Sequence, residues 1–546
     1  MKGSRTKTDF VDALSYPSKN LRPLGKDPIS VPRDPLITSY KPFKGNKTEP
    51  KNFFYSLYFT AFDVRDYGGS INKFMKIYAP LSIKKAYLET YRDGYTADRD
   101  QLLRVKKALE KSGISVSAGV TTTHFSDRAR YNETVSPAGC YSDRAAKRKM
   151  KKVFEFSASI FNEIIIDDWY FTICRCPECV KAKSGKTWEE FRGRLLSDAA
   201  KKYIIGPAKK INKNVKIILK LPQWYEYYYS NGYDLNRLIP LFDEIAVGTE
   251  TRDYKKTRFM PVHAAMLFRY IKNLAPGRVK KAWFDSYMCD SEIYMEQAYQ
   301  SVLGGAEEII LFCAGVMPQK DMRPLVESLI ANTGRIDRLS NFKNIFNIPL
   351  LRETNAADGR KLNQYLLMAG IPVYITDKKE FREKIIVLTG ESSKKPERLR
   401  IFNNLIKEGK DIVMTAEFAS DMKKYFSVKK LKKDIRVTHI KMNGREHNIR
   451  DNIFIKSEVV SGKNLALLNN AYPFVSYFRI KESRVYIINF PATKEVIKNH
   501  MGESVSAGYR YLLHSPDMVT AVKNIFKNYA NLNLYDKIKT FYKYNV

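Results

Sequence analysis

Four cysteines are the residues of this sequence whose type and spacing most clearly indicate chemistry. Cys174, Cys176 and Cys179 lie within one run of six residues, Cys-Arg-Cys-Pro-Glu-Cys, and Cys140 precedes them in the chain. Zn²⁺ accepts thiolate ligands and takes four ligands in a closed, tetrahedral structural site. Because one short loop can wrap three thiolates around an ion, this trio with Cys140 as the fourth ligand predicts a structural Zn²⁺. The alternative is a cluster of reduced thiols without a metal.

A pair of acids, Asp167 and Asp168, ends an apolar run shortly before the cysteine trio. Glycoside hydrolysis needs two carboxyl groups, one a proton donor with a raised pKa and the other a nucleophile or a base. Glu250 and Asp285 follow later apolar runs and are further candidates for these roles. Neighbouring residues of a regular strand point to opposite faces, so we expect only one of the adjacent acids to be catalytic. The other would cap the following segment or orient an arginine.

Three of the four tryptophans, Trp169, Trp224 and Trp283, lie near these acids. Aromatic faces stack on the apolar faces of sugar rings, whereas carboxylates and arginines bind sugar hydroxyls. The tryptophans are therefore candidates for substrate binding, and the alternative is that they seal the core. The other candidates for substrate binding are Glu89, Arg92, His124, Arg252, Asp253 and Tyr287.

The elements that must position these residues are eight strands alternating with helices. The strand-like runs are continuous in apolar residues, as is typical of strands buried on both faces. They cover residues 53–62, 85–90, 114–120, 163–166, 215–221, 244–248, 279–284 and 308–312. Helical patterns between them include residues 97–112, 144–161, 187–211, 262–274 and 291–303. This order predicts a (β/α)8 TIM barrel over residues 52–320, with the functional residues at the carboxyl ends of the strands.

The pattern changes after the predicted barrel. A helix at 359–370, strands at 371–375 and 384–389, a helix at 396–408 and a strand at 411–415 form a smaller parallel βαβαβ unit. Short strands follow from 428 to 490, and an amphipathic helix covers 521–529. We therefore predict four regions: an N-terminal arm at 1–51, the barrel at 52–320, an α/β domain at 321–425 and a β-rich domain with a terminal helix at 426–546.

Composition limits the class of protein and its partners. The chain has 546 residues, 44% of them hydrophobic, which is enough for several cores and excludes wholesale disorder. Lysine and arginine outnumber aspartate and glutamate by 94 to 58. This excess indicates either an anionic partner, such as an acidic glycan, or a lysine-rich solvated surface. The basic residues are spread along the chain without a nucleic-acid-binding motif, so we do not expect a nucleic-acid partner.

Neither a membrane span nor a disulfide framework is expected from the sequence. No apolar stretch approaches the ~20 residues that cross a bilayer, and residues 1–5 lack the apolar segment of a signal peptide. We expect a soluble, cytoplasmic protein, or a periplasmic or secreted one if a leader peptide has been removed. Cys289 and Cys313 are expected to be unpaired thiols, because six cysteines in a chain of this length do not form a disulfide scaffold.

The segment from Cys140 to Cys179, with Asp167-Asp168-Trp169-Tyr170 inside it, resembles the bacterial β-galactosidases of glycoside hydrolase family 42. That resemblance implies a TIM barrel, a zinc ion bound by the trio and the earlier cysteine, and an acid/base at the position of Asp168, where the family has Glu after Asn. It also implies a flavodoxin-like or glutamine-amidotransferase-like second domain that builds a trimer, and a small β domain.

Two departures from that family leave the assignment of the catalytic acids open. The family's acid/base and nucleophile are glutamates, whereas Asp168 and Asp285 stand at the two matching positions here. Other barrel glycosidases place the nucleophile on strand four and the acid on strand six. That arrangement would make Asp168 the nucleophile and Glu250 or Asp253 the acid/base.

A glycoside hydrolase, expected to retain the anomeric configuration, is the leading hypothesis for this chain. Its linkage and sugar are open, and an acidic glycan is one candidate substrate. A non-catalytic carbohydrate-binding barrel is the second hypothesis, and charge-driven nucleic-acid binding is a third, less favoured one. By analogy with the family, the protein is expected to form a homo-oligomer, a dimer or a trimer. No membrane partner is expected from the sequence.

Overall fold

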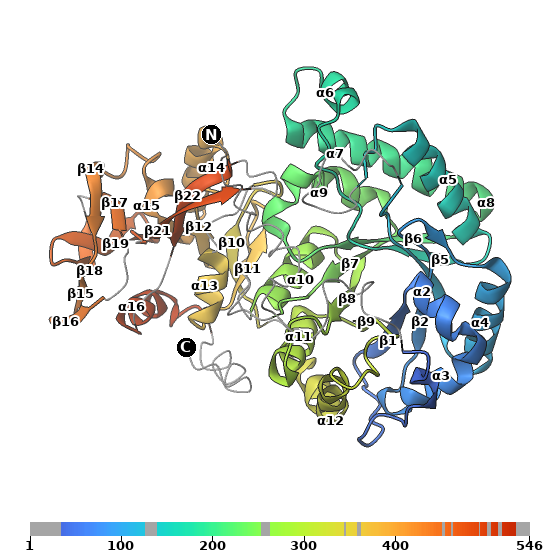
Figure 1. The fold of residues 1–546 in the computed structure, drawn as a ribbon. Coiled ribbons are helices and arrows are strands. Elements are labelled where there is room, and N and C mark those ends of the chain that lie inside the picture. Colours follow the sequence, from blue (N-terminus) through green and yellow to red (C-terminus); the bar gives the residue numbers. More distant parts are fainter. Residues whose placement is uncertain are drawn as a thin grey trace, which may run out of the picture. The chain divides into compact units, whose positions relative to one another are not determined.

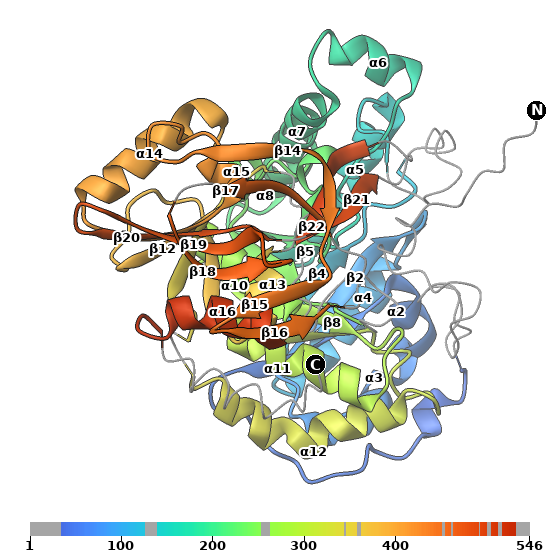
Figure 2. The same cartoon turned by 90° about the vertical axis from the view of Figure 1, so that its left-hand side faces the viewer.

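The computed structural model describes residues 34–125, 139–252, 262–342, 345–356, 362–449, 454–459, 462–490, 492–498, 504–511 and 516–530. These residues divide into two compact units, one reaching to residue 342 and the other comprising most of the chain from residue 345 onward (Figures 1 and 2). Most of the predicted N-terminal arm lies outside the described residues. Among the described residues, no helix is both long enough and apolar enough to cross a membrane.

The first unit is a closed barrel of eight parallel strands. The strands are β1 (Phe54–Phe59), β2 (Lys85–Arg92), β4 (Ser115–Val120), β5 (Glu163–Ile166), β6 (Lys216–Leu221), β7 (Glu244–Gly248), β8 (Val279–Asp285) and β9 (Glu308–Phe312). Each pairs with the next in sequence, and β1 also pairs with β9, with Tyr58 opposite Phe312, so the sheet closes on itself. The short strand β3 (Tyr95–Thr96) adds a hairpin to β2. The predicted TIM barrel is confirmed, and all eight predicted strands occur.

Helices surround this ring of strands (Figure 1). They include α2 (Ala61–Tyr67), α3 (Ile71–Ile77), α4 (Arg99–Lys111), α5 (Arg144–Ala158), α6 (Pro177–Lys183), α7 (Trp188–Ala199), α8 (Gly206–Ile211), α10 (His263–Leu274), α11 (Ser291–Gly304) and α12 (Arg323–Leu339). Local sequence explains where several begin, because aspartate or threonine side chains cap their first turns. Asp98 accepts from the Gln101 amide before α4, and Asp290 accepts from the Ile293 amide before α11.

The inside of the barrel is filled by side chains in layers, as the period of two along each strand requires. The layer at the amino ends is ionic: Lys281 Nζ lies 2.8 Å from Glu244 Oε2 and 3.0 Å from Glu308 Oε2. The middle layer is aromatic, with Trp283 packed between Tyr58 and Phe312 at centroid distances of 4.5 and 5.2 Å. Charged residues form the layer at the carboxyl ends, which is where the candidate site lies.

The second unit contains a parallel sheet in the order β11 (Val373–Thr376), β10 (Ile348–Leu351), β12 (Ile385–Leu388), β13 (Asp411–Thr415) and β20 (Ser483–Ile488). Taken in sequence, this is the 2-1-3-4-5 order of flavodoxin-like folds. Helices α13 (Leu362–Met368) and α14 (Lys395–Lys407) connect the strands. The predicted α/β unit is confirmed, and β10 is an additional strand that the sequence patterns did not identify.

The predicted β-rich region continues the same sheet. Antiparallel strands β19 (Tyr472–Ile480), β18 (Lys463–Leu468), β15 (His439–Met442) and β16 (Arg445–Asn448) follow β20, and β18, β19 and β20 are neighbours in Figure 2. A separate four-stranded sheet contains β14 (Val428–Arg436), β17 (Phe454–Val459), β21 (Ala492–Lys498) and β22 (Ser504–Tyr511). Helix α16 (Pro516–Phe526) lies near the end of the chain. The predicted α/β and β-rich regions therefore share one sheet, because β20 pairs in parallel with β13.

Candidate active site and metal centre

A single buried ammonium group joins three carboxylates at the carboxyl end of the barrel. Lys220, on β6, has a side chain that is only 3% exposed. Its Nζ lies 2.9 Å from Asp168 Oδ2, 2.9 Å from Glu250 Oε1 and 3.3 Å from Asp167 Oδ1. The Trp283 ring lies on another side of the ammonium, with its centroid 4.2 Å from Nζ. The structure thus brings together three of the four predicted catalytic acids around a cation.

Both members of the acid pair contact this ammonium, which corrects the expectation that only one would point inward. Strand β5 ends at Ile166, so Asp167 and Asp168 lie beyond the regular strand and need not alternate between faces. The Asp167 carboxylate accepts the Asp168 backbone amide at 2.8 Å and so turns the chain at this point. Asp167 also binds Arg92, whose Nη2 is 3.0 Å from Asp167 Oδ2. The predicted role of one acid in orienting an arginine is therefore observed for Asp167.

Glu89 and Arg92 form the buried support of this acid pair. Arg92 Nε lies 2.7 Å from Glu89 Oε2, and both side chains are at most 2% exposed. The Glu89 carboxylate also accepts from the Tyr58 hydroxyl and the Ala61 amide, each at 2.8 Å. Both side chains are buried and engaged in these contacts, so in this structure Glu89 and Arg92 hold Asp167 in place.

Adjacent in sequence, the two acids differ in pKa by several units. Burial tends to raise the pKa of Asp167, but the Lys220 and Arg92 cations outweigh it and lower the pKa to about 2. Burial and the charges of Asp167 and Glu250 raise the pKa of Asp168 to about 7, against the opposing effect of Lys220, the cation that it contacts among the described residues. Asp168 is also the most accessible of the acids, with a side chain 19% exposed. A carboxyl group that keeps its proton near neutral pH can serve as a general acid.

Glu250, which follows β7, is fully buried, and its two carboxylate oxygens have different environments. Its Oε1 binds Lys220, whereas its Oε2 has no hydrogen-bond partner among the described residues. Burial raises the pKa of Glu250 against the opposing effect of Lys220. Gly248 makes room for the carboxylate, because a Cβ at that position would clash with Oε2. Asp168 Oδ2 and Glu250 Oε1 both lie 2.9 Å from Nζ, so they are separated by no more than twice that distance.

Asp285, at the end of β8, is held by an arginine. Arg252 donates to both of its carboxylate oxygens, from Nε at 3.2 Å and from Nη2 at 2.6 Å. The Tyr287 amide donates to Asp285 Oδ1 at 3.1 Å. Arg252 has a left-handed backbone conformation (φ 49°), which a non-glycine residue keeps only where its surroundings enforce it. Three predicted site residues, Arg252, Asp285 and Tyr287, thus form one buried, strongly paired group.

The three tryptophans have different environments. Trp169 is partly exposed and stacks on Phe171 at a centroid distance of 5.9 Å. Trp224 is buried, with Phe171 at 5.2 Å and Tyr233 at 5.7 Å, and Trp283 is buried beneath Lys220. Of the three, Trp169 is therefore the one that offers an accessible ring, whereas Trp224 and Trp283 seal this end of the barrel.

One further candidate, His124, lies at the edge of the site, and another, Asp253, lies outside the described residues. His124 follows β4 with a side chain 55% exposed, and its Nε2 is 3.8 Å from Asp93 Oδ1. It is accessible to a ligand but is not part of the group around Lys220. Asp253 lies outside the described residues, so its place in the site stays a prediction.

Lys220 is the residue that the sequence patterns missed. A signal was present: the strand Lys-Ile-Ile-Leu-Lys-Leu carries a charged residue between buried leucines, and buried lysines occur only where they are paired. A lysine at the carboxyl end of a predicted barrel strand faces the same space as the strand-end acids. That reasoning would have placed it among them.

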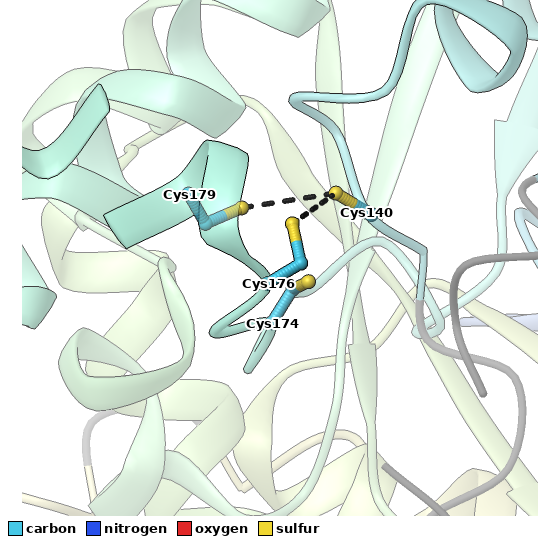
Figure 3. A group of neighbouring side chains, drawn as sticks. All are labelled: Cys140, Cys174, Cys176 and Cys179. Carbon is cyan, nitrogen blue, oxygen red and sulfur yellow. Dashed lines mark hydrogen bonds between the residues drawn. The ribbon is translucent and has the colours of Figure 1, made fainter. Parts of the chain in front are cut away.

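The four predicted zinc ligands come together in a buried cluster (Figure 3). Cys174 and Cys176 lie in the loop before α6, Cys179 lies on α6, and Cys140 approaches from the segment before α5. All four sulfur atoms lie within 4.8 Å of one another, and Cys140 Sγ is 3.6 Å from Cys176 Sγ and 3.7 Å from Cys179 Sγ. Zn–S bonds of about 2.3 Å in a tetrahedron place sulfurs about 3.8 Å apart. The cluster therefore fits a tetrahedral metal ion.

A TIM barrel with several buried carboxyl groups at the carboxyl ends of its strands is the architecture that many glycosidases use, and it is compatible with that class of enzyme. Residues 44–332 match the family described as "Probable glycosyl hydrolase, catalytic domain". Because this match spans more than half of the chain, the chain belongs to that family. Its barrel is the glycosyl hydrolase catalytic domain of the protein.

One curated relative and several solved structures resemble this chain. An uncharacterized protein of Saccharolobus solfataricus is 28% identical over 363 residues, and the match covers 60% of this chain and 60% of that protein. The β-galactosidase of Rahnella sp. R3 has a TM-score of 0.59 at 12% identity over 89% of this chain and 90% of that one. Gan42B, a family 42 β-galactosidase of G. stearothermophilus, has a TM-score of 0.60 at 10% identity over 89% of each chain.

A third structural relative is the α-L-fucosidase isoenzyme 2 of Paenibacillus thiaminolyticus, with a TM-score of 0.59 at 11% identity over 80% of each chain. At these identities the structural likenesses show the fold, and they confirm the resemblance to family 42 at that level. They extend over both units, because they cover most of the chain.

Proposed function

We propose that this protein hydrolyses a glycosidic bond with retention of configuration, using Asp168 as the acid/base and Glu250 as the nucleophile. The observation that carries the proposal is the contact of both carboxylates with one ammonium, which limits the separation of their nearest oxygens to twice 2.9 Å. Retaining glycosidases hold their two carboxyl groups about 5–5.5 Å apart, whereas inverting ones need about 6.5–9.5 Å.

In the first step, an oxygen of the Glu250 carboxylate attacks the anomeric carbon while the bond from that carbon to the leaving oxygen breaks. Asp168 gives its proton to the leaving oxygen, so an alcohol departs and a glycosyl ester of Glu250 forms. In the second step, Asp168 takes a proton from a water molecule whose oxygen attacks the anomeric carbon. The ester bond breaks, and both carboxyl groups return to their starting states.

Accessibility and protonation support this assignment over its reverse. Asp168 is the acid nearest to solvent, where a leaving group can depart, and it keeps a proton near neutral pH. Glu250 lies deeper and has an oxygen free to attack. Asp285 occupies the position of the family 42 nucleophile, but both of its oxygens are held by Arg252. We therefore assign Asp285 a supporting role.

We further propose that a carbohydrate ring stacks on Trp169 at the entrance of the site, with His124 and Asp253 near the outer subsites. An acidic glycan would be attracted by the positive charge of the chain, which has 94 lysines and arginines and 58 aspartates and glutamates. A β-galactosidase and a fucosidase share the fold, so the likenesses do not select the sugar. Assembly of the protein into a dimer or trimer stays a prediction.

We propose Zn²⁺ as the metal of the cysteine cluster. Cys140, Cys174, Cys176 and Cys179 would supply all four ligands, which leaves no open position for catalysis and makes the role structural. The ion would tie the loop that follows Asp168 to the segment before α5.

Azide rescue of variants tests the assignment of the two acids. On an activated aryl glycoside, Glu250→Gln should lower kcat/KM and Asp168→Asn should lower kcat by at least about a hundredfold, because the first variant lacks the nucleophile and the second lacks the base of the second step. Azide should restore Asp168→Asn with a product of retained configuration, and Glu250→Gln with an inverted glycosyl azide. Asp93→Asn, a carboxyl change at the same end of the barrel, is the matched control and should keep activity within a few-fold.

The outcomes separate the alternatives. Rescue with the two product configurations exchanged would assign Asp168 as the nucleophile. An inverted azide from Asp285→Asn, with full activity in Glu250→Gln, would move the nucleophile to Asp285. Binding of glycans by the unmodified protein without hydrolysis of any of them would favour a non-catalytic carbohydrate-binding barrel.

A further inference from the structure

We propose that Lys220 is the positioning residue of this site: its ammonium fixes the distance between Asp168 and Glu250 and keeps Glu250 ionised while Asp168 holds the proton. The proposal rests on the function proposed above for those two acids. It concerns a residue to which neither the family resemblance nor the structural likenesses assign a role.

Geometry shows that Lys220 acts on the carboxyl groups and not on a substrate. An ammonium has three N–H donors, and Lys220 has three carboxylate acceptors, one each from Asp167, Asp168 and Glu250, at 2.9–3.3 Å. The Trp283 ring covers a further side of it at 4.2 Å. No donor is left for a sugar hydroxyl, so the effect of Lys220 on the reaction must pass through the acids.

The charges of the surrounding groups explain why one proton stays in the cluster. Glu89 is paired with Arg92, and Asp285 is paired with Arg252. Among the described residues, three carboxyl groups then share one cation, Lys220, with Arg92 giving additional support to Asp167. Three like charges at this distance cannot all persist beside one cation, so one group keeps its proton. Asp168 and Glu250 each contact Lys220 alone among the described cations, and Asp168, which is 19% exposed against 1% for Glu250, is the group that we expect to keep the proton.

Lys220 itself stays charged in this setting. Burial alone would lower its pKa, but Asp168, Glu250 and Asp167 together raise it above the ordinary value for lysine. The amine is therefore not a nucleophile at neutral pH. Without the ammonium, the three carboxyl groups would have to bind a second proton. Among the described residues, Glu250 and Asp168 are the members of the three that form no direct ion pair with an arginine, so Glu250 is the group expected to take that proton.

The pH dependence of kcat/KM tests this inference in Lys220→Met, which keeps the length of the side chain but removes its charge. The acid limb of the profile reports ionisation of the nucleophile, and in Lys220→Met it should move to higher pH by at least about one unit. At a pH on the acid side of the limb, this shift lowers kcat/KM about tenfold. Lys220→Arg keeps the charge and should keep the limb, although its larger head group should lower kcat. An unchanged limb in Lys220→Met would overturn the proposal.

Lys281→Met is the matched control. Lys281 is another buried lysine of a barrel strand, 8% exposed on β8, but it pairs with Glu244 and Glu308 at the opposite end of the barrel. Its loss should lower the unfolding temperature without moving the limb. If Lys281→Met moved the limb as far as Lys220→Met, the effect would be a general consequence of a damaged barrel, and the proposal would fail. Lys220→Gln replaces Lys220→Met if the latter does not fold.

An infrared titration of protein labelled with ¹³C in its aspartate and glutamate carboxyl groups separates this inference from the proposed function. Near neutral pH, Lys220→Met should show one more protonated carboxyl group than the unmodified protein, and the additional Glu250→Gln substitution should remove that signal. If the additional protonated carboxyl group appears in Lys220→Met but the unmodified protein hydrolyses no glycoside, the proposed function is refuted and the role of Lys220 stands. Glycosidase activity without the additional proton would refute the role of Lys220 alone.

Discussion

Two neighbouring aspartates illustrate how strongly contacts decide the chemistry of a residue type. Asp167 contacts both Arg92 and Lys220, and its pKa falls to about 2, whereas Asp168 shares only Lys220 and its pKa rises to about 7. Two consecutive residues of the same type are therefore a permanent anion and a proton donor. The permanent anion is the residue that supports the fold, and the proton donor is the one at the solvent edge.

The first prediction concerns the pH dependence of hydrolysis. The pKa of Asp168 is raised to about 7 by burial and by the neighbouring carboxylates. A general acid acts in its protonated form, so kcat/KM should fall as the pH rises through about 7. The fall should be steep for substrates with a poor leaving group, such as an alkyl glycoside, and weak for an activated aryl glycoside. A profile that stays flat across this range for both substrates would remove Asp168 as the acid.

The second prediction concerns stability. Asp167 has a pKa of about 2 in the folded protein, below the ordinary value of 3.8 for aspartate. Its contribution to the free energy of unfolding is therefore fully present above about pH 4 and is lost as the pH falls toward 2. Replacing it with Asn breaks a buried ion pair and leaves Lys220 and Arg92 with less compensation. At neutral pH we expect a loss of about 3 kcal/mol in the free energy of unfolding.

Denaturant unfolding at several pH values measures that difference, which should shrink as the pH falls below about 4. Glu190→Gln is the control, because Glu190 forms an exposed i,i+4 pair with Arg194 that should contribute less than about 1 kcal/mol. Equal losses in the two variants would show that burial of the Asp167 pair has no energetic consequence.

At the scale of elements, the sequence was sufficient where the signal was local. The eight barrel strands could be predicted because each is a continuous apolar run, and the cysteine cluster because its ligands lie close together in sequence. Strand β20 was assigned to a separate β region because its parallel pairing with β13 joins residues 73 positions apart, such as Ile412 and Val485, and no local pattern encodes that pairing. Lys220 was missed for a related reason, since its three partners come from two other strands.

The adjacent acids show a second limit. The alternation rule predicted opposite directions for Asp167 and Asp168, but β5 has only four residues and ends at Ile166. The rule holds for regular strands and not for the turn after one. The exact end of a strand depends on its pairing partners, which in this barrel are β4 and β6.

The third prediction concerns the cysteine cluster, in which Cys140 from the segment before α5 meets three cysteines between β5 and α7. Elemental analysis should find about one zinc per chain. Cys176→Ser should lose it and should raise the hydrogen exchange of α6 (Pro177–Lys183), because this short helix is tied to the barrel through Cys179. Cys289→Ala, a buried cysteine outside the cluster, should keep the metal. Full zinc in Cys176→Ser would show that the metal is bound elsewhere.

At the scale of the whole molecule, the chain joins a family catalytic barrel to a second unit with a flavodoxin-like order of strands. The curated relative is matched over 60% of its length, whereas the solved β-galactosidases are matched over 89–90% of theirs. The site described above depends only on residues of the barrel unit. The excess of basic residues, in contrast, belongs to the entire chain, with 94 lysines and arginines against 58 acids.

The last prediction uses that charge. An excess of positive charge attracts an anionic glycan over a distance set by the ionic strength, about 30 Å at 0.01 M salt and about 3 Å at 1 M. If the substrate is anionic, its KM should rise at least about tenfold between these conditions, while the KM of a neutral oligosaccharide of equal length should change less than about twofold. Steady-state kinetics on the matched pair of substrates gives both values in one experiment.

Equal KM values at both salt concentrations for the anionic glycan would mean that the basic residues form a solvated surface and do not select the substrate. Because salt also screens surface charges that affect folding, circular dichroism at each salt concentration provides the control, and the spectrum should stay constant. A neutral substrate with the higher kcat/KM at both salt concentrations would then place the specificity of this enzyme in the barrel site alone.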